Sequence, residues 1–224
     1  MRSRSPGARR DAGVSDAEDL VGAVAAAGVR DPRLLDALRA VPRSGFVPPE
    51  VTRWAYLDRP LPIPHGQVTT QPSLSAKMIQ ALGLKGSERV LEVGTGYGFQ
   101  TALLARLANS VYSVERFPDF AAATRENLDL QGVENVEVVV GDGTEGLPER
   151  APYDAILVSA AFTSVPPPLV RQLSEGGRLV QPIGSGGEEE VILFEKMEGD
   201  LVRRRTVTGA HFVRLYGAHA FQGR

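Results

Sequence analysis

Apolar positions follow two different periods along this chain, and the two periods alternate. Short runs of Val, Ile and Leu suit strands buried on both faces, while the segments between them place Leu, Met or Ile every three or four residues, as helices do. Strands are predicted at residues 89–93, 111–114, 136–140, 153–158 and 178–183. Helices are predicted at about 71–83, 103–107, 118–130 and 168–173. Alternating strands and helices favour a parallel sheet covered by helices on both faces.

The pattern changes after residue 183. Two apolar runs at 191–194 and 201–207 are joined by Glu198-Gly-Asp200, which is typical of an antiparallel hairpin, and residues 212–215 fit one more strand. The predicted fold class is therefore α/β. We expect a doubly wound, Rossmann-like sheet that is mainly parallel, with an antiparallel C-terminal edge and additional helices at the N-terminus.

The N-terminal part of the chain lacks this alternation. Residues 1–14 carry Arg among Ser, Pro and Gly with little apolar surface, which predicts a disordered tail. Two helices should follow, the first opened by a capping box at Ser15-Asp-Ala-Glu18 and the second by Asp31-Pro32. Residues 42–72 are dense in Pro and aromatic residues without a clear period. They predict a long structured loop, and such loops are commonly functional.

Composition narrows the class of protein. The chain has 224 residues, of which 42% are hydrophobic, so residues 15–224 are expected to form a single domain around one core. With a formal net charge of -2 the protein has no overall positive potential to attract a polyanion, so no nucleic-acid partner is expected. The absence of Cys excludes disulfides and thiolate metal sites, and with 3 His no metal site is expected. No apolar run reaches the roughly 18 residues of a membrane span, so we expect a cytoplasmic monomer that does not bind membranes.

The strand at 89–93 runs directly into a glycine turn, Gly94-Thr-Gly-Tyr-Gly98. Glycines there permit dihedral angles and close backbone approaches that a Cβ would block. The dinucleotide fingerprint Gly-x-Gly-x-x-Gly would need its third glycine at Phe99, where it is missing. Gly-x-Gly-x-Gly preceded by Glu92 resembles instead the S-adenosylmethionine-dependent methyltransferases of the doubly wound type.

Three acids stand at the ends of three successive predicted strands, namely Glu92, Glu115 and Asp142. Ligands of open α/β sheets bind beyond these strand ends, so Glu115 is expected to accept ribose hydroxyls and Asp142 an adenine amino group. Three carboxylates would repel phosphate, which favours S-adenosyl-L-methionine over NAD or ATP. The predicted cofactor-binding residues are Glu92, Gly94, Thr95, Gly96, Gly98, Glu115, Arg116, Asp142 and Gly143.

The loop before the glycine turn reads Pro-Leu-Pro-Ile-Pro-His-Gly-Gln-Val-Thr-Thr-Gln-Pro at residues 60–72. It resembles the Pro-Leu-Pro-Ile-Gly-x-Gly-Gln-Thr-Ile-Ser-Gln-Pro loop of the protein-L-isoaspartate O-methyltransferase family. The resemblance extends from about Leu34 to Leu215 and includes the stretches at 35–48, 90–102, 113–116, 141–143, 153–161 and 176–184.

This resemblance implies transfer of a methyl group from S-adenosyl-L-methionine to the free α-carboxylate of L-isoaspartyl residues in damaged proteins or peptides, with repair through a succinimide. A carboxylate with a reference pKa near 4 is ionised at pH 7, so no general base is needed. By resemblance, Thr70 occupies the position of a family Ser whose hydroxyl contacts the substrate carboxylate, and it is the predicted catalytic residue. The other predicted acceptor-binding residues are Thr69, Gln71, His65, Val213 and Arg214.

The loop departs from the family pattern at two positions, with Val68 in place of Thr and Pro64 in place of Gly. A related O-methyltransferase that acts on an aspartate of one dedicated peptide, forming an aspartimide, therefore remains an alternative. A second alternative is a module that binds the cofactor without turnover. Thr69 and Thr70 could also simply cap the helix that opens at Gln71-Pro72.

Overall fold

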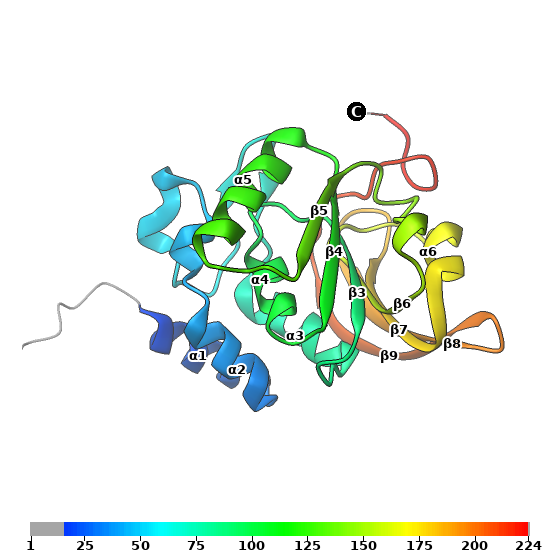
Figure 1. Ribbon diagram of the computed structural model, residues 1–224, viewed down its shortest axis with the longest axis horizontal. Coiled ribbons are helices and arrows are strands. Elements are labelled where there is room, and N and C mark those ends of the chain that lie inside the picture. The colour runs from blue at the N-terminus through cyan, green and yellow to red at the C-terminus, as the bar shows by residue number, and fades with distance from the viewer. Residues whose placement is uncertain (1–15, 224) are drawn as a thin grey trace, which may run out of the picture.

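A seven-stranded sheet crosses the centre of the structure, a computed structural model that describes residues 16–223 (Figure 1). The strand order is β5-β4-β3-β6-β7-β8-β9. Pairs from β5 to β7 are parallel, whereas β7–β8 and β8–β9 are antiparallel, so the predicted mixed sheet is confirmed. The strands are β3 Arg89–Val93, β4 Ser110–Glu115, β5 Val136–Val140, β6 Tyr153–Val158, β7 Leu173–Ile183, β8 Glu189–Met197 and β9 Asp200–Ala210.

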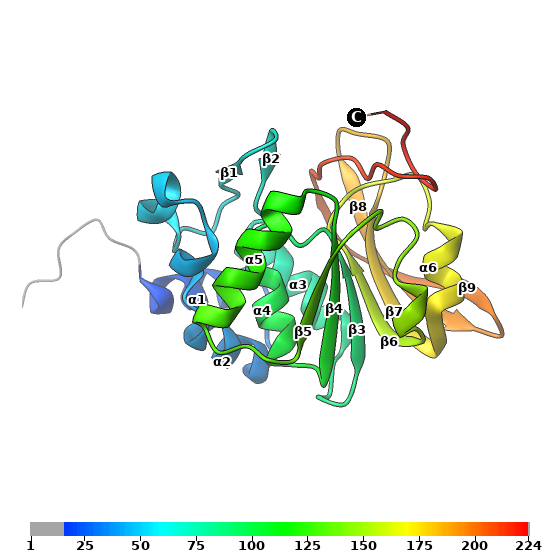
Figure 2. The same ribbon diagram turned by 45° about the horizontal axis from the view of Figure 1, so that its top comes forward.

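Helices cover both faces of this sheet, as Figure 2 shows. Helices α3, α4 and α5 lie on one face, and α1 and α2 pack against α3 and α4. Helix α6 covers the other face and buries Leu169 against the second core cluster. Successive β3 residues alternate between the clusters, Val90 on the α4 side and Leu91 on the α6 side. The helices are α1 Ala17–Ala26, α2 Pro32–Ala40, α3 Pro72–Leu82, α4 Phe99–Ala105, α5 Pro118–Leu130 and α6 Pro167–Gln172.

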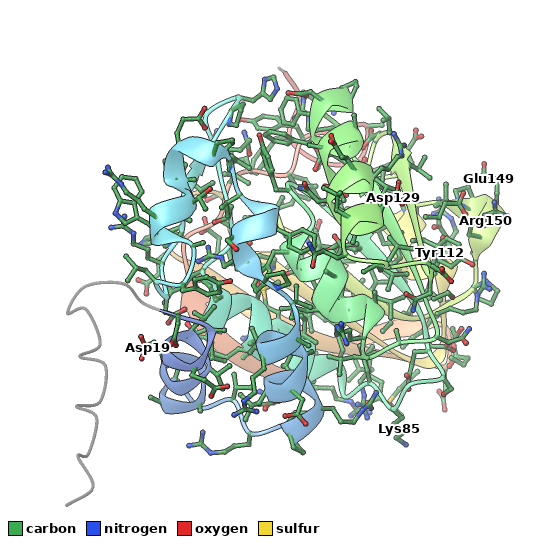
Figure 3. All side chains as sticks on the ribbon, turned by 60° about the vertical axis from the view of Figure 1, so that its left-hand side comes forward. Asp19, Lys85, Tyr112, Asp129, Glu149 and Arg150 are labelled. Carbon is green, nitrogen blue, oxygen red and sulfur yellow. The ribbon has the colours of Figure 1, made fainter. Side chains whose placement is uncertain are left out.

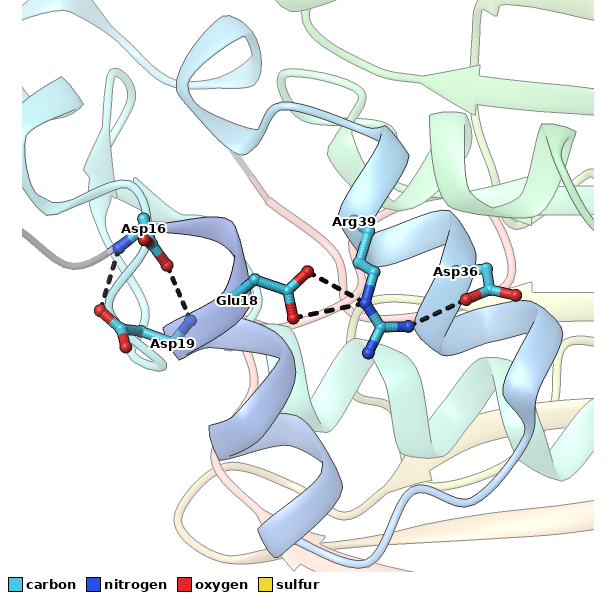
Figure 4. Close-up of polar contacts among 5 residues, drawn as sticks. All are labelled: Asp16, Glu18, Asp19, Asp36 and Arg39. Carbon is cyan, nitrogen blue, oxygen red and sulfur yellow. Dashed lines mark hydrogen bonds and ion pairs between the residues drawn. The ribbon is translucent and has the colours of Figure 1, made fainter.

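Helix α1 begins one residue later than predicted, because its capping box uses two aspartates (Figure 4). Asp19 N–H donates to Asp16 Oδ1 at 3.0 Å, and Asp16 N–H donates to Asp19 Oδ2 at 3.2 Å. Glu18, predicted to close the box, pairs instead with Arg39 of α2 at 3.0 Å. The predicted Ser15–Glu18 box is therefore wrong, since Asp16 caps the helix and Asp caps as well as Ser does. Ser15 itself lies outside the described residues. The predicted disordered tail, residues 1–14, lies outside the described residues.

The long loop between α2 and α3 contains short elements. Two 3-10 helices, Arg43–Phe46 and Pro49–Trp54, precede a hairpin of β1 Pro62–Ile63 and β2 Gln67–Val68. The loop has its own small core, formed by Val47, Val51, Ala55 and Leu61. This core makes the segment a structured loop, as expected, and carries the hairpin toward the carboxyl edge of the sheet (Figure 2).

The segment after β9 forms no full strand, in contrast to the prediction for residues 212–215. It touches the end of β6 through one isolated bridge, where Ala161 N–H donates to Val213 O at 2.8 Å and Leu215 N–H donates to Ala161 O at 2.8 Å. The segment thereby lies across the carboxyl edge of the parallel strands. Within residues 16–223, no helix combines the length and the apolar composition needed to cross a membrane.

Candidate functional site

A cavity of about 740 Å³, counting the space open at its mouth, lies at the carboxyl edge of the parallel strands. Its walls come from the glycine turn, the end of β4, the β1–β2 hairpin and the segment after β9. Of the predicted site residues, it brings together Gly94, Gly96, Glu115, Arg116, Gly143, Thr70, Val213 and Arg214. We call it the cofactor cavity.

The glycine turn adopts left-handed backbone conformations at each glycine. The φ angles are 91° at Gly94, 58° at Gly96 and 91° at Gly98. A Cβ at Gly94 would lie 3.4 Å from Ser159 Cβ, and one at Gly98 would lie 2.7 Å from Thr124 Cγ2. Gly94 and Gly96 therefore leave room at the cavity wall, whereas Gly98 lets α4 begin close to α5.

Glu92 lies behind the turn rather than on the wall of the cofactor cavity. Its fully buried carboxylate accepts hydrogen bonds from Gln100 Nε2 (2.9 Å), Thr101 Oγ1 (2.6 Å) and Ser113 Oγ (2.7 Å). Burial raises the pKa of Glu92 to about 7, although these three bonds oppose the shift. In this structure the hydrogen bonds of Glu92 link β3, β4 and α4, and Glu92 does not line the cofactor cavity, so its direct contact with the cofactor stays a prediction.

Glu115 faces the cofactor cavity and is held by backbone donors. Gly96 N–H donates to its Oε2 and Phe117 N–H to its Oε1, both at 2.9 Å. A fixed carboxylate acceptor beside two glycines fits a nucleoside that presents ribose hydroxyls. Next to it, the guanidinium of Arg116 lies over the ring of Tyr216, 5.4 Å from its centroid.

Asp142 is engaged by the C-terminal segment. Its carboxylate accepts from Thr144 N–H (2.8 Å), Thr144 Oγ1 (2.7 Å) and Ala218 N–H (2.6 Å). Burial alone would raise the pKa of Asp142, but these hydrogen bonds outweigh it and lower the pKa. Asp142 borders a neighbouring cavity with Gly217, while Gly143 lines the cofactor cavity. The sequence did not reveal the contact between Asp142 and the C-terminal segment, because Ala218 is 76 positions away.

A second cavity of about 1080 Å³ on the same measure opens beside the first. We call it the acceptor cavity. It is lined by Thr69, Thr70, Gln71 and Val213 from the predicted set and by Lys77 of α3, among others. A third, smaller cavity between the loop and the glycine turn contains Thr95 and Gly98.

Thr70 and Ser159 line all three cavities, so both side chains stand where the cofactor and acceptor cavities meet. Among the described residues, the Thr70 hydroxyl has no hydrogen-bond partner. The N-cap of α3 is Gln71, and no side chain caps it. The helix-capping interpretation of Thr69 and Thr70 is therefore wrong, and the Thr70 hydroxyl can donate to a ligand.

A buried guanidinium that we did not predict as a site residue holds this loop. Arg43 is 1% exposed and donates to the carbonyl oxygens of Ala55 (2.8 Å), Leu57 (2.9 Å) and Arg59 (3.1 Å) and to Thr69 Oγ1 (3.0 Å). Burial lowers the pKa of Arg43 to about 10, against the attraction of Asp58. The sequence offered one signal, a lone Arg inside an apolar stretch, but not its partners.

Three further predicted acceptor residues have other neighbours. Gln71 Nε2 donates to Asp58 Oδ2 at 3.0 Å, and Arg214 lies over the ring of Phe221, 5.1 Å from its centroid. His65 lies at the hairpin turn and does not line the acceptor cavity, so its contact with the substrate stays a prediction. Within residues 16–223, no group of His, Cys, Asp or Glu could hold a metal ion.

The family model for protein-L-isoaspartate(D-aspartate) O-methyltransferase matches residues 15–220. A protein-L-isoaspartate O-methyltransferase of Methanoculleus marisnigri is 50% identical over 200 residues, 89% of this chain and 90% of that protein. The one of Anaeromyxobacter dehalogenans is 56% identical over 167 residues, 74% of this chain and 79% of that protein.

Solved structures show the same architecture. A protein-L-isoaspartate O-methyltransferase with 30% identity superposes with a TM-score of 0.80, over 92% of this chain and 67% of that one. A putative protein-L-isoaspartate O-methyltransferase from Plasmodium falciparum, in complex with S-adenosyl-L-homocysteine, superposes with a TM-score of 0.78 at 22% identity, over 90% of this chain and 98% of that one. The latter likeness shows the fold alone.

Proposed function

The chain belongs to the protein-L-isoaspartate(D-aspartate) O-methyltransferase family, and from that premise we propose how its two cavities divide the reaction. The enzyme transfers a methyl group from S-adenosyl-L-methionine to the free α-carboxylate of L-isoaspartyl residues in damaged proteins or peptides. The resulting ester collapses to a succinimide, which starts repair.

We assign the donor to the cofactor cavity. Glu115 accepts the ribose hydroxyls, Gly94 and Gly96 allow the ligand to approach the backbone, and Gly143 with Asp142 flanks the adenine. Glu92 contributes by fixing α4 against β3 and β4. The bound donor supplies an electrophilic methyl group on a positively charged sulfur, and the carboxylate of Glu115 does not repel it.

We assign the isoaspartyl carboxylate to the junction between the cavities. Thr70 is the observation that carries this assignment, because its free hydroxyl lines both cavities. An ionised carboxylate there needs no base, so orientation and exclusion of water supply most of the acceleration. Thr69, Gln71 and Val213 shape the acceptor cavity around the peptide.

The alternative substrate, a normal aspartate in one dedicated peptide, is not favoured, since the relatives at 50% and 56% identity are named for isoaspartate. We further propose that the enzyme works in the cytoplasm as a monomer and without nucleic acid. Cell fractionation would test the first point, light scattering of the purified protein the second, and the ratio of absorbance at 260 and 280 nm of the purified protein the third.

Radiolabelled S-adenosyl-L-methionine and two peptides that differ only in Asp against isoAsp test the activity. We expect base-labile label in the isoAsp peptide and almost none in the Asp peptide. Label in the Asp peptide instead would support the aspartimide-forming alternative. Binding of S-adenosyl-L-homocysteine without transfer to either peptide would overturn the proposed activity.

A further inference from the structure

His65 occupies the turn of the β1–β2 hairpin in a strained conformation. Its φ angle is 58°, and that of the following Gly66 is 64°. Gln67 N–H closes the turn on Pro64 O at 3.1 Å. A non-glycine residue with positive φ carries a cost, so neighbouring contacts must hold the imidazole where it is.

Those contacts come from the start of α5, more than fifty residues along the chain. His65 Nε2 lies 2.8 Å from Asp119 Oδ2, and since an ionised carboxylate only accepts, the imidazole donates here. The ring stacks on Phe117 with centroids 4.3 Å apart and planes 1° apart. It also meets the edge of Phe120 at 5.2 Å and 71°. One side chain thus makes three contacts with α5 and its N-cap residue, Phe117.

These contacts join two sides of the cofactor cavity. Gln67 and Val68 of the hairpin line one side of it, and Phe117 and Phe120 line another. A ligand beside Glu115 therefore lies under a hairpin that His65 ties to α5. The side chains of His65 and Asp119 are 40% and 58% exposed, and each strand of the hairpin has two residues. Exposed pairs of this kind are weak, so the contacts between His65 and α5 can break and form again.

We propose that His65 is a positioning residue that fastens the hairpin over the cofactor cavity and slows release of the bound nucleoside. This inference rests on the proposed function only for the identity of that nucleoside. Closure also keeps Thr70 over the cavity, because Thr70 is the second residue after β2. Opening of such a segment can limit turnover through product release.

Dissociation of S-adenosyl-L-homocysteine, followed by stopped-flow mixing, tests the proposal. We expect His65→Ala to dissociate roughly tenfold faster than the unchanged protein, because a stacked ring and a hydrogen bond are lost. His65→Phe keeps the ring and His65→Gln keeps a donor, so each should give a smaller increase. Combining His65→Phe with Asp119→Asn should add little, since the same hydrogen bond is already absent.

Hydrogen exchange in the ligand-free protein gives a second readout. The amides of Gln67 and Thr69 should exchange faster in His65→Ala. Asp129→Asn serves as the control, because Asp129 is exposed on the same helix and its carboxylate has no partner among the described residues (Figure 3). Unchanged dissociation together with unchanged exchange would overturn the proposal. Failure of the unchanged protein to bind S-adenosyl-L-homocysteine would instead contradict the proposed function.

Discussion

The cofactor side and the acceptor side of the site are built in different ways. On the cofactor side, Glu92 pairs in register with Ser113 of β4 and Leu157 of β6, and Glu115 ends the neighbouring strand. On the acceptor side, the loop on both sides of the β1–β2 hairpin is held by one buried guanidinium, that of Arg43. Backbone pairing between strands therefore positions Glu92 and Glu115, whereas a few side-chain contacts position the acceptor loop. Substitutions should damage the two sides separately.

Arg43→Met should have the largest effect and should be confined to the acceptor side. Three loop carbonyls and Thr69 would lose a buried, charged donor, which we expect to cost about 4 kcal/mol of unfolding free energy. Urea denaturation measures this loss. In the protein that remains folded, the KM for the isoAsp peptide should rise while calorimetry finds nearly unchanged affinity for S-adenosyl-L-homocysteine. Equal losses of peptide binding and of S-adenosyl-L-homocysteine affinity would contradict the separate construction of the two sides. Arg43→Lys should show the same pattern with smaller changes.

Glu92→Gln probes the cofactor side through stability. The pKa of Glu92 is raised from 4.5 to about 7 in the folded protein, so the folded state binds more protons than the unfolded state between these values. The stability contribution of this group therefore falls as pH rises through that window and stays constant above it, by about 3 kcal/mol in all. The unchanged protein should lose stability from pH 5 to pH 7.5 relative to Glu92→Gln. Parallel pH profiles of unfolding would contradict the raised pKa.

Glu115→Gln should weaken cofactor binding about 50-fold, because ribose hydroxyls would lose a charged acceptor. Calorimetric titration with S-adenosyl-L-homocysteine measures the effect. At saturating cofactor the KM for the peptide should stay close to its original value. Glu149→Gln removes the same charge from an exposed position away from the cavity and should leave affinity unchanged (Figure 3).

Thr70→Val should have the smallest of these effects. Because Thr70 lies where the cofactor and acceptor cavities meet, it tests most directly whether the two sides can be affected separately. Loss of one hydroxyl donor to the carboxylate should lower kcat/KM for the isoAsp peptide about tenfold. Affinity for S-adenosyl-L-homocysteine should change less than twofold. Thr70→Ser keeps the hydroxyl and should retain most activity. A fall in cofactor affinity as large as the fall in transfer would argue against the role assigned to Thr70.

Local pattern predicted the parts of the site that the strands carry. The apolar run at β3 and the glycines after it predicted both the turn and its position at the sheet edge, where Gly94, Gly96 and Glu115 meet. Strand ends in a parallel sheet come together because register and crossover direction are restricted. The same logic did not show that Glu92 points behind the turn, since that depends on which face α4 covers.

What the sequence did not predict is a set of contacts between distant segments. His65 was predicted to contact the substrate, and the sequence did not show that it pairs with Asp119, 54 positions away on α5. Asp142 stays a predicted contact of the adenine amino group, and the structure adds that Ala218, near the end of the described chain, donates an N–H to its carboxylate. Arg43 was missed because its partners are backbone carbonyls, which carry no sequence signature.

The sequence by itself thus determined the sheet, the glycine turn, the acidic strand ends and the family to which the acceptor loop belongs. These features follow from periodicity and from residue types that one local conformation requires. Only the tertiary structure decided that Thr70 stands between two cavities, that Arg43 supports the loop and that His65 ties it to α5. Such contacts join segments far apart in the chain, and their geometry is set by packing that no local pattern encodes.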